Sequence, residues 1–336
     1  MDIKMWIQEI IEQKQRVAIP IMTHPGIEKN GNSVKEALQD GAIHAKAIEK
    51  INDVYPVAAT TAIMDLTLEA EAFGCQIDFP EHEMPNIIGR LVSSAEEIEK
   101  LKVPDLSAGR IAEFLMANQL TVNANYGKPV LAGAIGPFSL AGRLYDMSEI
   151  MMACYMEPDV IMMLLEKCTQ FLLSYCTELK RIGCSGVVIA EPAAGLLSND
   201  DGMIYSTPYI KQIVDALQDD HFLVVLHNCG NHGHCTGAML ASGAGALHFG
   251  NAMNMVEALT ACPEDMLIMG NIDPVGVLKN LTSTEVFDIT TSLLRQTAAF
   301  ENFVLSTGCD LPPQVSARNI RAFFDALNAY NMTNCL

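Results

Sequence analysis

The sequence has few basic residues for its length. Its 336 residues include 21 Lys and Arg against 40 Asp and Glu, so the formal charge at neutral pH is −19. Nucleic acids and anionic membrane surfaces are bound through clustered Lys and Arg side chains that neutralise phosphate. We therefore expect no nucleic acid and no membrane as a partner.

Long apolar runs are also missing. No stretch offers the roughly 20 consecutive apolar residues that a spanning helix needs, and the first residues lead into an amphipathic segment instead of a signal peptide. The ten cysteines do not form a disulfide framework, because Cys154, Cys168 and Cys176 fall in predicted helices. These features predict a reduced, cytoplasmic protein whose cysteines are mostly small core residues.

Short apolar segments alternate with helical patterns along the chain, and no linker or repeat divides it. Eight segments are rich in apolar residues, as in parallel strands covered on both faces: 17–22, 56–64, 129–134, 186–190, 223–227, 246–249, 266–270 and 302–306. This pattern predicts a single (β/α)₈ barrel, an α/β domain of residues 1–336, with an open doubly wound sheet as the alternative. Residues 75–107 lack a clear strand and are interpreted as an N-terminal excursion at the barrel mouth.

Polar residues directly follow the predicted strands, at the barrel end where catalytic residues lie. They are Asp65, Glu191, His227, Cys229, Asn251, Asn271, Asp273, Cys309 and Asp310. His227 and Cys229 are two residues apart on one strand, so both side chains point to the same face. With Cys309, which follows the last strand, they form a set that suits Zn²⁺ and leaves a fourth position open for a substrate. The alternative interpretation is two buried core cysteines and a hydrogen-bonded histidine.

Several motifs together resemble the uroporphyrinogen decarboxylase superfamily, and specifically its branch of methylcobamide:coenzyme M methyltransferases. His227-x-Cys229 followed far downstream by Cys309 resembles the ligand signature of that branch. The acidic motif that starts at Asp65, the Gly136-Pro137-Phe138 motif and the late Asp273-Pro274 motif resemble other family segments. The similarity covers most of the chain.

The resemblance implies transfer of a methyl group from a methyl-corrinoid, carried by a partner corrinoid protein, to a small-molecule thiol such as coenzyme M. In that reaction zinc holds the thiol as a thiolate, and the cobalt leaves as cobalt(I). We assign His227, Cys229 and Cys309 to the metal and Glu191 and Asp273 to catalysis. Asn231, Asn251 and Asp65 are assigned to cofactor binding. Glu191 is either a fourth zinc ligand displaced by the thiol or an outer carboxylate.

Other functions stay open at this point. A uroporphyrinogen decarboxylase needs cationic partners for its polyanionic substrate, yet residues 21–29 contain no arginine where the decarboxylases have an arginine-bearing segment. A corrinoid-dependent demethylase of a methylated substrate and a non-catalytic corrinoid-docking subunit are the further alternatives. His232, His234 and Cys235 are interpreted as residues of a solvated loop. The methionines between Met147 and Met163 have the spacing of a helical core face.

Overall fold

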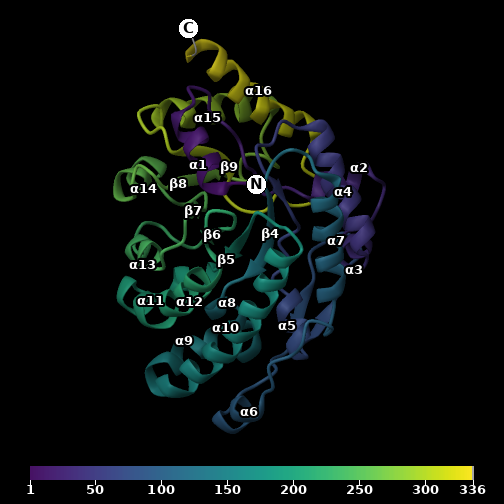
Figure 1. Ribbon diagram of the computed structural model, residues 1–336, viewed down its shortest axis with the longest axis vertical. Helices are drawn as coiled ribbons and strands as arrows, with labels where there is room; N and C mark the ends of the chain where they lie inside the picture. Colours follow the sequence, from purple (N-terminus) through teal and green to yellow (C-terminus); the bar gives the residue numbers. More distant parts are fainter. Residues whose placement is uncertain (335–336) are drawn as a thin grey trace.

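The sheet of this protein curls into a barrel with helices outside it (Figure 1). The computed structural model describes residues 1–334. Within that range, seven strands form the main sheet and every neighbouring pair is parallel. In sheet order they are β1 (Thr60–Thr61), β4 (Val130–Ile135), β5 (Gly186–Ala190), β6 (Leu223–Asn228), β7 (Ala246–Phe249), β8 (Leu267–Ile272) and β9 (Phe303–Thr307). The predicted barrel is confirmed, and its carboxyl strand ends lie together.

Residues 17–22 lie between the two edge strands and close the barrel. The Ile19 amide donates to the Leu305 carbonyl at 2.9 Å, and the Ala58 amide donates to the Ala18 carbonyl at 2.9 Å. Only a single bridge, Ala18 with Leu305, joins this segment to β9. The sequence predicted full strands at residues 17–22 and 56–64. Pro20 has no amide hydrogen and interrupts the first ladder, and the second segment contributes only the two residues of β1.

Side chains that face the barrel interior form an apolar cluster of their own. Alternate strand residues contribute to it, including Val225 of β6 and Met269 of β8, because residues two apart on a strand share a face. Helix α1 (Ile3–Glu12) adds Ile3 to this cluster, and the Ile3 amide donates to the Asp220 carbonyl just before β6. Helix α1 therefore covers the amino-terminal end of the barrel and leaves the carboxyl end for the site.

Apart from α6, which is described with residues 75–107 below, the remaining helices lie outside the barrel sheet (Figure 1). They are α2 (His24–Lys29), α3 (Val34–Gln39), α4 (Gly41–Val54), α5 (Leu68–Phe73), α7 (Ile111–Ala124), α8 (Pro137–Tyr145), α9 (Met147–Met156), α10 (Pro158–Arg181), η1 (Pro192–Leu196), α11 (Asn199–Tyr205), α12 (Thr207–Leu217), α13 (Thr236–Ala241), α14 (Met255–Ala261), α15 (Ser283–Gln296) and α16 (Ala317–Asn334). None of the described helices has the length and apolar character needed to cross a membrane.

The methionines of α9 and α10 differ from the predicted core face. Met152 and Met156 are 57% and 79% exposed, and Met163 is 39% exposed. The buried residues of α9 are Ile150, Ala153 and Cys154, and Met147 and Met151 are partly buried against the core. The prediction that the methionines form a core face was wrong for these three, because the apolar stripe was broad enough to continue around the helix to solvent.

Residues 75–107 contain a small structure outside the barrel sheet. Strands β2 (Gln76–Asp78) and β3 (Asn86–Ile88) pair antiparallel, and α6 (Ala95–Lys100) follows them. The Leu91 amide donates to the Leu144 carbonyl at the end of α8, and the Lys167 ammonium donates to the Leu101 carbonyl. These bonds attach the segment to α8 and α10, whereas its place at the barrel mouth stays a prediction.

Candidate metal centre

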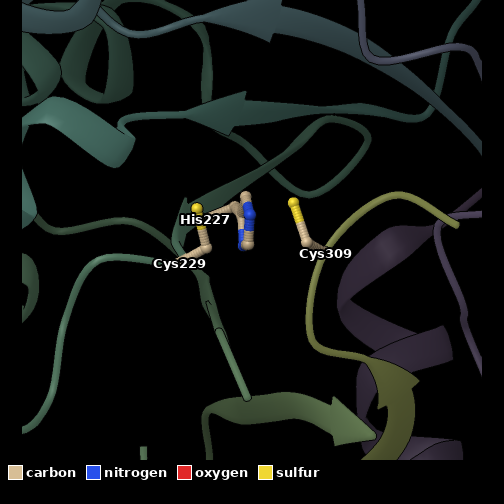
Figure 2. Close-up of side chains that lie close together, drawn as sticks. All are labelled: His227, Cys229 and Cys309. Atoms are coloured by element: carbon tan, nitrogen blue, oxygen red, sulfur yellow. The ribbon is translucent and has the colours of Figure 1, made fainter. Parts of the chain in front are cut away.

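The side chains of His227, Cys229 and Cys309 converge at the carboxyl end of the barrel (Figure 2). One ligand atom of each residue lies within 4.8 Å of the other two. The strand alternation that places Val225 inside the barrel also directs His227 and Cys229 inward. Cys309 reaches the same place from the loop after β9. The structure therefore brings together the three residues that the sequence predicted as metal ligands.

The His227 ring has one nitrogen bonded and one free. Its Nδ1 lies 2.7 Å from Nδ1 of His248, its direct neighbour on β7. The His227 Nε2 atom is buried and has no hydrogen-bond partner among the described residues. A buried polar nitrogen without a partner is costly, and a metal ion is a partner that would remove that cost. The orphaned nitrogen fits a metal ligand.

A chain of hydrogen bonds determines which nitrogen of His227 carries the proton. The Ser306 hydroxyl donates to the Ile19 carbonyl at 2.7 Å, so it must accept from the Nε2–H of His248, 2.8 Å away. Burial holds the pKa of His248 well below its ordinary value, so that ring is neutral and its Nδ1 is an acceptor. The His227 Nδ1–H therefore donates to it, which leaves Nε2 with a lone pair.

The two sulfur atoms act on each other, and their pKa values move in opposite directions. The Cys309 thiol hydrogen-bonds to Cys229, which lowers the pKa of Cys229 to about 7. The same bond, together with burial, raises the pKa of Cys309 to about 12. The remaining described cysteines are all buried, whereas these two are partly exposed. A cation bound to both sulfurs would hold them as thiolates.

Glu191 lies at the end of β5, as predicted, but its carboxylate is already bonded to the protein. It accepts hydrogen bonds from the Phe138 amide at 3.1 Å and the Ser139 amide at 2.5 Å, at the first turn of α8. Burial raises the pKa of Glu191 to about 7. Glu191 was predicted either as a fourth zinc ligand or as an outer carboxylate. The contacts agree with the outer carboxylate, because each of its oxygens already accepts a hydrogen bond from a backbone amide. Its part in catalysis remains a prediction.

Asn251 and Asp273, predicted for different roles, lie side by side. The Asn251 amide donates to the Asp273 Oδ2 atom at 3.0 Å. The other oxygen of Asp273 accepts from the Val275 and Gly276 amides, which makes Asp273 the cap of a turn. Neither residue belongs to the cluster of potential metal ligands. Their assignments to the cofactor and to catalysis remain predictions.

Asn231 organises the loop that follows Cys229. Its side-chain oxygen accepts from the Gly233 amide at 2.8 Å and the Cys235 amide at 3.2 Å, and its nitrogen donates to Thr236. Asn231 is fully buried. His232 and His234 are exposed, as predicted, and the ring of His234 contacts the Gly195 carbonyl. Cys235 was predicted to be solvated as well, but it is buried. The loop is thus held by Asn231, whose contact with a cofactor stays a prediction.

Asp65 lies in a buried charged cluster beside the site. Its Oδ2 accepts from Arg110 at 2.6 Å, and its Oδ1 accepts from the amide and hydroxyl of Thr67. Arg110 also bonds Glu71 at 2.6 Å. Glu69 is buried nearby, with one oxygen on the Ile135 amide and the other without a partner, and burial raises its pKa to about 8. Asp65 is therefore oriented by Arg110 and Thr67.

Sequence reasoning missed His248 and Ser306. His248 lies on the interior face of β7, next to β6, and Ser306 lies on the interior face of β9. Both strands are otherwise apolar. The available signal was a polar residue at an inward position of an otherwise apolar strand. His24 was also missed. Its Nε2 lies 3.8 Å from the carboxylate of Asp310, the residue that follows Cys309 in the chain. Burial lowers the pKa of His24 to about 4.

Comparison with known proteins places the chain in a family. The family model for uroporphyrinogen decarboxylase (URO-D) matches residues 15–330, so the chain belongs to the uroporphyrinogen decarboxylase family. A methylcobamide:CoM methyltransferase of Methanosarcina mazei, MtbA, is 29% identical over 309 residues, 90% of this chain and 89% of the relative. A uroporphyrinogen decarboxylase of Azotobacter vinelandii is 27% identical over 289 residues, 82% of this chain and 80% of the relative.

A solved structure described as a methyltransferase from Methanosarcina mazei has the same fold. It matches with a TM-score of 0.87 at 19% identity, over 98% of this chain and 99% of that chain. The family resemblance predicted from the motifs, including the resemblance to the methyltransferase branch, is confirmed.

Proposed function

We propose that this protein is a corrinoid-dependent methyltransferase that moves a methyl group from a methyl-corrinoid to the sulfur of a small thiol. The observation that carries the proposal is the inward-facing set of one unpaired imidazole nitrogen and two cysteine sulfurs. Its similarity to MtbA over 90% of the chain supports the reaction class. Three protein ligands match a catalytic zinc site rather than a structural one, which would have four.

His227, Cys229 and Cys309 would hold the zinc ion. Bound there, the ion supplies positive charge that lowers the pKa of a coordinated thiol, so that the acceptor reacts as a thiolate. The chain contributes two thiolates that keep the site electron-rich and a neutral imidazole whose tautomer is already fixed through His248. His227 is itself buried, so water screens the charge of an ion on its nitrogen less than it would at the surface.

The methyl donor would arrive on a separate protein. A corrinoid is too large to fit among the side chains that fill this barrel, so its cobalt must approach the carboxyl end from outside. A thiolate that forms a bond to the methyl carbon displaces the cobalt, which keeps the electron pair as cobalt(I). The reaction therefore needs no further oxidant or reductant.

X-ray absorption at the zinc edge tests the acceptor. Addition of 2-mercaptoethanesulfonate, the chemical form of coenzyme M, to the zinc-loaded protein should raise the number of sulfur ligands from two to three. About one proton should be released for each thiol bound near neutral pH, because the thiol binds as thiolate. Methylcobalamin should lose its methyl group only when both thiol and metal are present.

An unchanged zinc spectrum together with continued consumption of methylcobalamin would contradict a thiol acceptor and favour a demethylase. If neither thiols nor methylcobalamin had any effect, the non-catalytic docking subunit would be favoured. The Cys235→Ser protein is the matched control for the thiol response, since Cys235 lies near the site but outside the ligand cluster.

A further inference from the structure

Five large apolar side chains are exposed on α9, η1 and α11. Helix α9 presents Met152, Tyr155 and Met156 on one face, because residues three and four apart lie side by side on a helix. Their side chains are 57%, 69% and 79% exposed. Leu196 of η1 and Ile204 of α11 are 60% and 45% exposed. These five residues are called the rim patch.

Hydrogen bonds hold the elements of the rim patch together. The Tyr155 hydroxyl of α9 donates to the Oδ2 atom of Asp201 in α11 at 2.7 Å, and the Ser198 hydroxyl donates to the same oxygen at 2.7 Å. Ser198 caps α11 and follows Leu196 by two residues. Helices α9 and α11 therefore lie next to each other (Figure 1). Apolar side chains that are exposed together, and not singly, are typical of an interaction surface.

The rim patch begins beside the candidate metal ligands. Gly195 of η1 packs against Gly230, because a methyl group added at Gly195 would lie 2.5 Å from the carbonyl carbon of Gly230. The His234 ring also contacts the Gly195 carbonyl, at 3.0 Å. Leu196 and Cys229 are the chain neighbours of these two glycines. The exposed Leu196 is thus fixed next to the loop that carries Cys229.

The length of α10 places α9 beyond the carboxyl ends of the strands. Helix α10 has 24 residues, a length of about 36 Å, and it packs along β4 and β5. It ends just before β5 starts, at the amino-terminal end of the barrel. Strand β5 has 5 residues, about 17 Å. Helix α10 therefore begins well past the carboxyl end of β5, and α9, which directly precedes it, lies at the rim of the barrel mouth.

The charged residues around the rim patch are carboxylates. Residues 144–166 and 182–210 contain no lysine or arginine. Their exposed carboxylates are Asp146, Glu149, Glu157, Asp159, Glu166 and Asp200. Among these, within residues 1–334, only Glu149 has an ion-pair partner, Arg90. A partner that is apolar at its centre and carries lysine and arginine around it complements this surface.

We propose that the rim patch is the docking surface for the protein that carries the methyl-corrinoid, and that this partner meets it with an apolar surface bordered by basic residues. The inference rests on the proposed function and identifies where the methyl donor is held. A cobalt that approaches Cys229 from outside passes beside Leu196, so its carrier covers the rim. A specific interface takes about 20–30 residues from each partner, so it is large enough to reach from η1 to α9.

A second copy of this chain fits the rim patch less well. Pairing about a twofold axis brings the same surface of two copies together. The carboxylates around the rim patch would then face identical carboxylates, and like charges set against each other oppose association. The charge of this surface therefore favours a basic partner over self-association.

Two methyl donors separate docking from chemistry. Free methylcobalamin needs no docking surface, whereas a corrinoid protein does. The protein donor is the corrinoid protein of the source cells, purified by its corrinoid absorption, reduced to cobalt(I) with titanium(III) citrate and methylated with methyl iodide. The acceptor is 2-mercaptoethanesulfonate.

The zinc-loaded wild type is compared with the double variant Met152→Gln, Met156→Gln, which keeps the size and charge of both side chains. The matched control is Met332→Gln. Met332 is 77% exposed and lies on α16, at the opposite end of the molecule from α9 (Figure 1).

With the corrinoid protein as donor, kcat/KM should fall about 10- to 100-fold in the double variant through a higher KM, because two apolar contacts of the interface are lost. Added salt should slow the wild type with this donor, because it screens the carboxylates from the basic partner. Free methylcobalamin should react at the wild-type rate in the double variant, which also shows that the variant is folded. Met332→Gln should match wild type with both donors.

Equal kcat/KM in wild type and the double variant with the corrinoid protein would overturn the inference. An equal loss with both donors would overturn it too, since the effect would then lie at the metal centre. A wild-type dimer in analytical ultracentrifugation that the double variant does not form would assign the rim patch to a second copy of the chain.

Failure of the proposed function has a different signature. The wild type would then transfer no methyl group from either donor, and docking is measured without turnover, by co-sedimentation with the corrinoid protein. Binding that is lost in the double variant but kept in Met332→Gln would retain the docking surface and reject only the reaction. Methyl transfer that does not depend on the rim patch would retain the function and reject the docking surface.

Discussion

The Nδ1 atoms of His227 and His248 lie 2.7 Å apart, on paired residues of adjacent parallel strands. Only one of two such nitrogens can carry the hydrogen. The bond of His248 to Ser306 assigns that hydrogen to His227. The strand register thus fixes the tautomer of the imidazole that faces Cys229 and Cys309.

Replacement of His248 by phenylalanine removes the acceptor and should weaken zinc binding about 10- to 100-fold, the usual effect of losing an outer partner of a ligand. Ser306→Ala should weaken it less, because His248 stays in place. Zinc affinity is measured by competition with a chelator. His232→Ala, an exposed histidine of the nearby loop, is the control. Unchanged affinity in His248→Phe would reject the role of the pair.

Each chain should bind about one zinc ion, and Cys309→Ala should lose most of it, because two remaining ligands hold zinc poorly. Elemental analysis of protein purified with zinc measures the ratio. Cys235→Ser should keep a full equivalent, since its sulfur lies outside the cluster. A Cys309→Ala protein with full zinc content would exclude Cys309 as a ligand.

Glu69 should make the protein less stable as the pH rises. Burial raises its pKa from 4.5 to about 8 in the folded chain, so the folded state binds the proton more tightly than the unfolded state. The stability contribution is complete below pH 4.5 and is lost as the pH rises through 8, on the order of 5 kcal/mol. Glu69→Gln removes this loss.

Urea unfolding of wild type and Glu69→Gln at pH 5 and pH 8 measures the effect. The variant should gain stability relative to wild type at the higher pH. The exposed Glu264→Gln serves as the control and should follow wild type. If the free energy of unfolding changed with pH in the same way in wild type and Glu69→Gln, Glu69 would not be the source of the loss of stability at high pH.

Loss of Arg110 should destabilise the fold by about 3–5 kcal/mol, because Asp65 would keep a buried charge without its partner. Arg110→Leu is compared with Lys211→Met, which breaks an exposed pair with Asp215. The exposed pair should cost less than about 1 kcal/mol. Denaturant unfolding measures the loss of stability in each variant. An equal loss in the two variants would contradict the prediction that the buried ion pair contributes more than the exposed one.

Much of the barrel followed from the sequence because parallel strands covered on both faces are continuous in apolar residues. The segments of β5 and β7 were predicted with their observed bounds. The closing segment was harder, because Pro20 reduces its ladder to one bridge. That bridge depends on a contact with Leu305 at the far end of the chain, which no local pattern reveals.

The grouping of His227, Cys229 and Cys309 could be predicted because the first two share a strand face and Cys309 follows the last strand. The partners of these residues could not. The His248 contact depends on the register of β6 with β7, and the Glu191 contacts depend on where α8 begins. Both are relations between separate segments, so only the folded chain determines them.

The position of Cys309 has a consequence for biosynthesis. His227 and Cys229 leave the ribosome about 80 residues before Cys309, and the strand that leads to Cys309, β9, is also the one that the 17–22 segment must meet. A truncated or nascent chain therefore has two ligands and an open barrel at the same time. The proposed ligand set and the closed barrel are both completed by the same stretch of polypeptide, β9 and the loop that follows it.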